Sequence, residues 1–409
     1  MGVSRSEGVP VGLANLLRCG RHTKASWGVA STMLDHEGKK QERSKPVDTM
    51  TEGAQAALLP TASVSSGATT LRCALIGYGA WGTHHARVMA RNPQSQLVAI
   101  AACSEATQAR ARQEHPSCTV YGDYRAMLDK ERLDAVAVVL PSHLHFEASK
   151  AVLESDRHLL LEKPMCLSVA HCRQLNGLAA SRQRILAIVH EMRLSSLWGK
   201  GKELIDARAI GTPLYLLIEL WRKPYRPGAD GWRYDVRRVG NWILEEPIHF
   251  FDLARWYLEG FAQPVSVYAR ANAQRPDHPE LQDHFSATVT FSGGQFAMIA
   301  QCLTGWEHHQ IVKVAGTDGA LWAAWSGAMD RTFEPTFGLK LQRGAAVEEI
   351  PIPRAAGEVF ELEDQFARFV RCLRGEGAPA ATGVDGEWSV RLCLKAQESV
   401  ERGTPVAVD

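Results

Sequence analysis

Two rhythms of apolar and polar residues divide the chain after Leu71. Between residues 71 and 161, short and continuously apolar runs alternate with segments of helical periodicity. Continuous apolar strands that alternate with helices are typical of a parallel sheet covered on both faces, so this half is predicted to be a doubly wound α/β sheet. The predicted strands are 71–76, 97–102, 118–121, 135–140 and 158–161, and the predicted helices are 84–91, 107–114, 124–129 and 146–154.

After about residue 193 the apolar runs follow one another without intervening helices. Ser292-Gly293-Gly294 is a hairpin turn signal between two of these runs. Consecutive strands of this kind are typical of an antiparallel sheet, and a second domain built on such a sheet could close over a ligand of the first. The predicted strands are 213–221, 265–270, 285–291, 295–301 and 310–315.

Residues 1–69 differ from the rest because they are rich in small, polar and charged residues and have no sustained period. We interpret them as a disordered extension, or as the result of an upstream start codon with Met50 as the true start. Two targeting patterns stay open: residues 1–6 match an N-myristoylation motif, and residues 1–34 are poor in acids, as weak transit peptides are. The predicted domains are 1–69, 70–192 and 193–409.

Composition argues against several classes of protein. The chain has 409 residues and a net charge of +1, so it has no basic footprint for nucleic acid. Because no apolar run is long enough to span a bilayer, no membrane partner is expected. The nine cysteines are odd in number and form no C-x-x-C pair. We therefore expect reduced thiols, a cytoplasmic location and no metal site.

The first predicted strand ends in a glycine motif, G-x-G-x-x-G. In a strand–turn–helix setting, the first glycine permits the turn, the second lets a diphosphate approach the backbone, and the third lets helix and strand pack closely. The helix N-terminus adds free N–H groups and a partial positive charge for phosphates. The motif therefore predicts dinucleotide binding by Gly77, Tyr78, Gly79, Ala80, Trp81 and Gly82.

Three other strand ends are candidates for ligand contacts, because ligands of such sheets lie beyond the carboxyl ends of the strands. Two are the loop 141–145 and Glu162-Lys163-Pro164. At the end of the second strand, an acid would favour NAD by binding its ribose, but Ala102 stands there, with Glu105 close behind. The cofactor is therefore predicted as NAD or NADP.

These motifs resemble the Gfo/Idh/MocA family of NAD(P)-dependent oxidoreductases. The resemblance covers residues 71–409 and also rests on segments 245–252, 382–386 and 398–399. It implies a Rossmann domain, then a C-terminal α/β domain with a large, mostly antiparallel open sheet through which homo-oligomers, dimers or tetramers, form. Together with the strand ends, it implies cofactor contacts from Ala102, Ser104, Pro141, Ser142, His145, Glu162, Lys163 and Pro164.

Lys163 and His249 are the main predicted catalytic residues. A lysine at a strand end can stabilise developing alkoxide charge, although a solvated surface lysine is the alternative. Pro247 is a natural first residue of a helix, so His249 lies in the first turn, where the helix dipole disfavours imidazolium. A proton acceptor needs a neutral ring. The residues alone leave a core histidine equally open, and the resemblance places the family's catalytic histidine on His249.

Two acids flank this histidine. Glu245, also predicted as catalytic, stands where the family commonly has aspartate, so its role as substrate orienter or as partner of His249 stays open. Asp252 lies one helical turn beyond His249, and the two side chains can therefore face each other. Asp252 either holds the imidazole, contacts the substrate or caps local charge.

Four other predicted residues have more than one open interpretation. His145 lies beside the cofactor or caps a helix, and Arg193 contacts the substrate or the domain interface. Trp232 and Arg233 belong to an aromatic and basic cluster that suits a sugar or cyclitol ring, or else a dimer contact or core packing. The predicted substrate contacts are Arg193, Trp232, Arg233 and Asp252.

The predicted function is that of a cytoplasmic NAD(P)-dependent dehydrogenase. A secondary alcohol of a sugar, inositol or related polyol would lose hydride to nicotinamide while His249 takes the hydroxyl proton and Lys163 polarises the oxygen. The resemblance leaves two alternatives: an NAD-dependent glycoside hydrolase and a non-enzymatic regulator that senses the cofactor. The presence of both Lys163 and His249 argues against the regulator.

Overall fold

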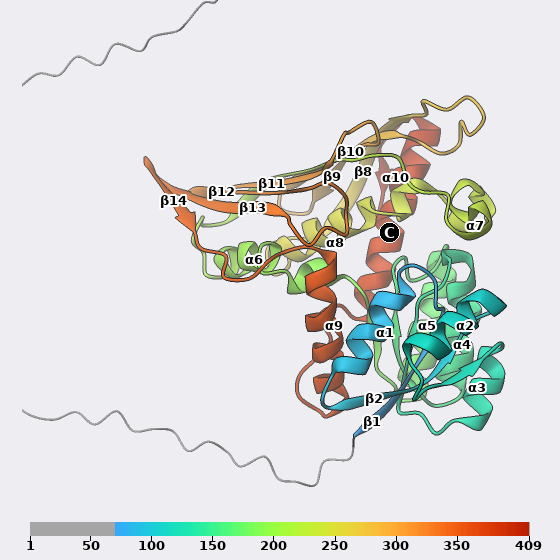
Figure 1. Cartoon of the computed structure of the whole chain (residues 1–409). Helices are drawn as coiled ribbons and strands as arrows, with labels where there is room; N and C mark the ends of the chain where they lie inside the picture. The colour runs from blue at the N-terminus through green and yellow to red at the C-terminus, as the bar shows by residue number, and fades with distance from the viewer. Residues whose placement is uncertain (1–69, 409) are drawn as a thin grey trace, which may run out of the picture. The chain divides into compact units, whose positions relative to one another are not determined.

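A six-stranded parallel sheet forms the first half of the described chain (Figure 1). The structure is a computed structural model that describes residues 70–408, so the predictions made for residues 1–69 lie outside the described residues. The strand order is β3-β2-β1-β4-β5-β6. The strands are β1 (Leu71–Ile76), β2 (Ser95–Ala101), β3 (Thr119–Tyr121), β4 (Ala135–Val138), β5 (His158–Leu161) and β6 (Leu186–Ile188).

Helices between these strands confirm the predicted doubly wound arrangement. Polar N-caps begin several of them: Ser104 accepts a bond from the Thr107 N–H, and Ser168 accepts one from the His171 N–H. The order of the strands reverses between β1 and β4, which places a ligand crevice beyond the carboxyl ends of these two strands. The helices are α1 (Gly82–Arg91), α2 (Glu105–Glu114), α3 (Tyr124–Lys130), α4 (His145–Glu154) and α5 (Val169–Ser181).

The second half is built on a nine-stranded sheet in the order β14-β13-β12-β11-β7-β10-β9-β8-β15. Its neighbours are antiparallel except β7 and β10, which run parallel, so the predicted mostly antiparallel sheet is confirmed. The strands are β7 (Pro213–Trp221), β8 (Pro264–Asn272), β9 (His284–Phe291), β10 (Phe296–Cys302), β11 (His308–Gly316), β12 (Gly319–Gly327), β13 (Thr336–Arg343), β14 (Ala346–Ile350) and β15 (Val406–Ala407).

Helices cover one face of this sheet, where Leu216, Ile218 and Leu220 of β7 are buried. Figure 1 shows α8 and α6 beneath the strands. In residues 70–408, no helix is long and apolar enough to cross a membrane. The helical elements are α6 (Trp198–Asp206), α7 (Val236–Val239), α8 (Pro247–Tyr257), α9 (Glu358–Leu373), α10 (Gly383–Arg402) and the short 3-10 turns η1 (Ser142–Leu144), η2 (Glu191–Leu194), η3 (Ala229–Tyr234) and η4 (Trp242–Leu244).

The end of the chain returns to the first sheet. Phe366 and Phe369 of α9 are buried in one apolar cluster with Leu75 of β1 and Met89 of α1, and Figure 1 shows α9 beside α1. The Ile188 N–H also donates to the Ala381 carbonyl at 3.0 Å. The segment after residue 350 therefore contributes to the core of the first half. A division of the chain at residue 192 would assign this segment to the second half alone.

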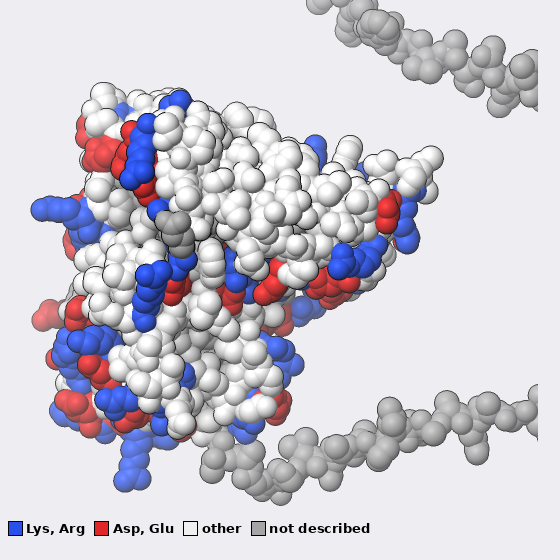
Figure 2. Space-filling view, turned by 180° about the vertical axis from the view of Figure 1, so that it is seen from behind, with Lys and Arg blue, Asp and Glu red and all other residues white. Residues whose placement is uncertain are grey.

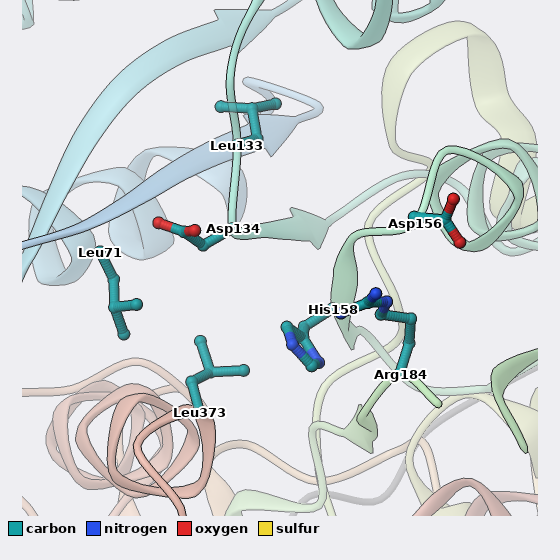
Figure 3. Close-up of a pocket in the computed structure, with 7 residues that line it drawn as sticks. All are labelled: Leu71, Leu133, Asp134, Asp156, His158, Arg184 and Leu373. Carbon is teal, nitrogen blue, oxygen red and sulfur yellow. The ribbon is translucent and has the colours of Figure 1, made fainter. Parts of the chain in front are cut away.

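A cavity of about 190 Å³ lies at the opposite edge of the parallel sheet from the ligand crevice (Figure 3). It is formed where β1 and β5 begin and where α9 ends, so it faces the amino ends of the strands. Ligands of open α/β sheets bind beyond the carboxyl ends of the strands, so the functional site is expected at the carboxyl edge and not at this cavity. The cavity is lined by Leu71, Leu133, Asp134, Asp156, His158, Arg184 and Leu373.

Candidate active site

The glycine turn between β1 and α1 leaves room for a ligand at one position only. Gly77 has a φ of +101°, and a Cβ there would lie 2.0 Å from the Val139 carbonyl oxygen. A Cβ at Gly82 would lie 2.0 Å from the Gly77 carbonyl oxygen, whereas a Cβ at Gly79 meets nothing within 4 Å. Gly77 and Gly82 thus serve close packing, while Gly79 faces open space. These residues fit a dinucleotide diphosphate held at the start of α1.

Glu162 ties this turn to the end of β5. Its buried carboxylate accepts bonds from the Trp81 indole N–H and from Nε2 of His85, both at 2.7 Å. The peptide bond between the next two residues, Lys163 and Pro164, is cis. The glycine turn and the loop that carries Lys163 are therefore held as one unit.

Lys163 links the two halves of the molecule. Its ammonium group donates to the carbonyl oxygen of Glu245 at 2.7 Å. Glu245 precedes α8 in the second half, so the predicted catalytic lysine already reaches across to the segment that contains His249. A substrate oxygen held at this ammonium group would lie between the two halves.

His249 lies in the first turn of α8 and is 1% exposed. Neither of its ring nitrogens has a hydrogen-bond partner among residues 70–408. Burial, together with the charge of Lys163 and the neighbouring ring of His190, holds the pKa of His249 well below its ordinary value. The imidazole is therefore neutral near pH 7, which is the state that can accept a proton.

Glu191, which the sequence analysis missed, faces this histidine. Its Oε1 lies 3.6 Å from Nε2 of His249. Burial raises the pKa of Glu191 well above its ordinary value, and the nearby charges of Glu358 and Glu162 raise it further. The one available signal was its place directly after β6, since strand ends of this sheet form the ligand edge.

The two glutamates before α8 are held by cations. The carboxylate of Glu245 accepts a bond from Nε of Arg233 at 2.9 Å, and no contact between this carboxylate and His249 is present in the described residues. Glu246 pairs with Arg222 and lies 2.8 Å from Nε2 of His308. Burial opposes ionisation of Glu246, but Arg222 and His308 hold its pKa well below the ordinary value.

Arg193 and Asp252 bind each other. The guanidinium group donates two bonds to the carboxylate, at 2.8 and 2.7 Å, and both side chains are buried. A second carboxylate, Asp385, lies 3.2 Å from Arg193. The structure does not bring Asp252 to His249, although helical spacing allows it, because the guanidinium fork offers stronger bonds than a neutral ring. The pair instead joins η2, α8 and α10.

His145 lies behind the two loops of the dinucleotide edge. It is fully buried, with Nδ1 2.7 Å from the Pro164 carbonyl oxygen and Nε2 2.8 Å from that of Leu140. Ser142, at the start of η1, is also buried. His145 therefore fixes the position of the loops that begin at Pro141 and at Lys163.

The remaining predicted residues contact groups other than His249. Trp232 is 8% exposed and packs in an apolar cluster that includes Trp242, and the Arg233 guanidinium carbon lies 4.5 Å from the centre of the Trp232 ring. Ala102 is buried beyond β2, and the hydroxyl of Ser104 caps α2. No carboxylate stands at position 102, so the end of β2 offers no acid at that position for a ribose.

Comparison with known proteins agrees with this geometry. A family model described as an oxidoreductase family with an NAD-binding Rossmann fold matches residues 71–190, and a model of the GFO/IDH/MocA C-terminal domain matches residues 198–322. An uncharacterized oxidoreductase of Bacillus subtilis (strain 168), YrbE, is 28% identical over 343 residues, which cover 82% of this chain and 96% of that protein.

Two other similar proteins act on or bind inositols. The scyllo-inositol 2-dehydrogenase (NAD(+)) of Bacillus subtilis (strain 168) is 24% identical, over 83% of this chain and 96% of that protein. A crystal structure of an inositol dehydrogenase homolog from Azotobacter vinelandii, complexed with NADH and myo-inositol, superimposes with a TM-score of 0.72 at 19% identity, over 83% of this chain and 98% of that chain. The chain belongs to the Gfo/Idh/MocA family and is an oxidoreductase with an NAD-binding Rossmann domain.

Proposed function

We propose that this oxidoreductase is a dehydrogenase that transfers hydride between nicotinamide and a secondary alcohol of a sugar, inositol or related polyol. The observation that supports this most is the buried, unpartnered imidazole of His249, whose pKa is lowered first by burial and then by the charge of Lys163. A neutral base and a cationic hydrogen-bond donor could then both reach the oxygen of one substrate hydroxyl group. Oxidation of a CH–OH group requires this, because the hydroxyl proton and the hydride leave the same group.

The residues of the chain would divide the work as follows. The bound dinucleotide supplies the hydride acceptor or donor. His249 takes the hydroxyl proton, and Lys163 donates a hydrogen bond to the same oxygen, in addition to or in place of its bond to the Glu245 carbonyl. Glu245 and Arg233 would orient the rest of the substrate, since Glu245 lies four residues before His249 and Arg233 of η3 holds its carboxylate.

The other predicted substrate residues support the site in this proposal. Arg193 and Asp252 satisfy each other, and Trp232 packs in an apolar cluster. We assign them to holding η2, α8 and η3 in place. The polyol class is supported by relatives whose names state scyllo-inositol or D-xylose as substrates, at 24% identity each.

One experiment tests this proposal: the purified full chain is offered a panel of polyols, inositols and sugars with NAD and, separately, NADP, and nicotinamide absorbance is followed. The expected result is reduction of the cofactor with at least one cyclic polyol or sugar. Glycoside cleavage without net change in the cofactor would instead favour the hydrolase alternative. Cofactor binding without turnover of any alcohol, in either direction, would favour the regulator. Titration of both cofactors settles the preference that Ala102 leaves open.

We further propose that two copies of the chain associate through the outer face of the nine-stranded sheet. Leu217, Met298, Lys313 and Trp322 stand in register across four neighbouring strands on this face, and Met298 and Trp322 are 41% and 55% exposed. In Figure 2, the upper part of the molecule has a broad central area without charged side chains, and its charged groups gather at the left side and along the lower right edge. Light scattering after gel filtration should give a dimer or tetramer, and Trp322→Glu should lower the mass. A parent protein that runs as a monomer would exclude this interface.

A further inference from the structure

A cation from the second half lies against the dinucleotide turn of the first half. Arg331 belongs to loop 328–335, which joins β12 to β13. The carbon of its guanidinium group is 4.4 Å from the centre of the Trp81 ring. Trp81 is the last residue before α1 begins, so Arg331 reaches the end of α1 that is expected to hold phosphate.

The charge of Arg331 is weakly compensated. Its ion pair with Glu358 is long, with 3.9 Å between Nε and Oε2. Burial, reinforced by the charge of Asp330, raises the pKa of Glu358 to about 7, so this carboxyl group is only partly ionised at neutral pH. Nε of Arg331 is buried and has no hydrogen-bond partner within residues 70–408.

The surroundings of Arg331 add positive charge. The N-terminus of α1 carries a partial positive charge, and the first turn of this helix contains no acid. The pKa of His84 in that turn is lowered, first by burial and then by the charge of Arg331. A guanidinium group beside the positive end of a helix is unfavourable unless an anion lies between them, and the open space at Gly79 is where such an anion fits.

We propose that Arg331 binds the diphosphate of the nicotinamide dinucleotide, from the side opposite to the glycine turn. Backbone N–H groups at the start of α1 would hold one side of the diphosphate, and the planar guanidinium fork would hold the other. The cofactor site is then completed by a residue that is 249 positions beyond Gly82 in the sequence and comes from the second half.

The same loop is anchored to the catalytic side. Oδ2 of Asp330 lies 3.5 Å from Nη2 of Arg222, which in turn pairs with Glu246, the residue directly before α8. On the other side, Trp81 donates to Glu162, the neighbour of Lys163. A diphosphate bound by Arg331 would thus hold together the two segments that carry Lys163 and His249.

Titration calorimetry of the full chain tests this inference with NADH and with ADP-ribose, which has the same diphosphate but no nicotinamide. Arg331→Gln removes the charge and keeps a planar group against Trp81, and we expect it to weaken both ligands about tenfold, the effect of losing one charge-assisted bond. Arg331→Lys keeps the charge without the fork and should give an intermediate loss. Adenosine, which has no phosphate, should bind parent and variant equally.

Arg354→Gln is the matched control, because Arg354 is exposed and pairs with Asp364 instead of lying against the turn. It should leave the affinities for NADH and ADP-ribose unchanged. If Arg331→Gln keeps NADH affinity within about twofold of the parent, or weakens adenosine as much as NADH, Arg331 merely packs on Trp81 and the inference is overturned. The titration needs no substrate, so its result does not depend on the proposed polyol chemistry.

Discussion

Two buried histidines of the candidate active site differ in how their ring nitrogens are used. His145 is fully buried, and both nitrogens lie within 2.8 Å of backbone carbonyl oxygens, those of Pro164 and Leu140. His249 is 1% exposed, and neither nitrogen has a partner in the described part of the chain. Polar atoms in protein interiors are normally hydrogen-bonded, so the bare ring of His249 requires an explanation that His145 does not.

The electrostatic surroundings of the two rings also differ, in how they change the pKa of each ring. Burial lowers the pKa of both. The carbonyl groups around His145 oppose this effect, whereas Lys163 and His190 add to it at His249. A ring that donates to one of two flanking carbonyl groups is fixed in the structure, and a neutral ring without partners is available to a substrate hydroxyl group. The comparison thus separates a positioning histidine from a proposed proton acceptor.

The largest expected effect comes from His249→Phe, which keeps a ring of similar bulk and removes the base. Turnover of the best substrate of the panel should fall by about 10²–10⁴, the usual cost of losing a general base. NADH affinity, measured by calorimetry, should stay within a few-fold because His249 is proposed to act on the substrate hydroxyl group and not on the diphosphate. Near-native turnover would make His249 structural, and the proton acceptor would then be sought at Glu191 and next at Glu245.

Lys163→Met is expected to have the next largest effect. It keeps the length of the side chain and removes the donor, so turnover should fall by about 10²–10³. It also distinguishes the two histidines. Burial and then the charge of Lys163 lower the pKa of His249, whereas burial, two backbone carbonyl groups and nearby carboxylates set the pKa of His145. In a pH titration followed by NMR, the His249 resonance should shift its midpoint upward and that of His145 should not. Equal shifts of the two titration midpoints would show that Lys163 affects both histidines alike, and would contradict the proposed difference between them.

The helices and strands that were predicted with the correct bounds are those flanked by residues that end a strand or helix, such as proline. β5 and β7 have the predicted bounds, 158–161 and 213–221, because each is a largely apolar run that is soon followed by a proline. β12 was not predicted, since its alanines and glycines have weak strand preference and the strand depends on pairing with β11 and β13. α9 was also not predicted, although its buried face completes the core of the first half.

The site divides in the same way. Lys163 and His249 were found through motifs that are local in the sequence. Glu191 and Arg331 belong to no motif and meet the site only through the fold, Glu191 at His249 and Arg331 at Trp81. At Asp252, helical spacing left a contact with His249 open, and Arg193, which lies 59 positions earlier, takes up its carboxylate. Local spacing says which residues can meet, and competition among distant partners decides which do.

His145→Ala tests the positioning role. A neutral ring has one N–H to donate, and its loss leaves a buried carbonyl group without a donor, which costs about 1–3 kcal/mol. Urea denaturation should show this loss of stability together with the cavity that the ring leaves. His249→Phe should be destabilised by less, because no hydrogen bond is lost. The reverse order of stability would contradict the comparison.

The smallest expected effect is a difference in acid stability. The folded-state pKa values of both histidines lie below the unfolded value of about 6.5, so the unfolded chain binds more protons at lower pH. The contribution of these two histidines to the free energy of unfolding is complete above about pH 6.5. As the pH falls, each histidine lowers the free energy of unfolding by up to about 1.4 kcal/mol per pH unit. Because the pKa of His249 is lowered further, His249→Phe should flatten the acid side of the stability curve over a wider range than His145→Ala.

Urea midpoints measured from about pH 7.5 to about pH 5 check this difference. Glu361 provides an internal reference: burial raises its pKa to about 7, so its contribution falls as the pH rises from its unfolded value toward 7, opposite in sign to that of the histidines. Glu361 is unchanged in both variants, and the difference between their curves therefore reports the two rings alone. Parallel curves for His249→Phe and His145→Ala would mean that the two rings are equally perturbed, and the unpartnered nitrogens of His249 would then need another explanation.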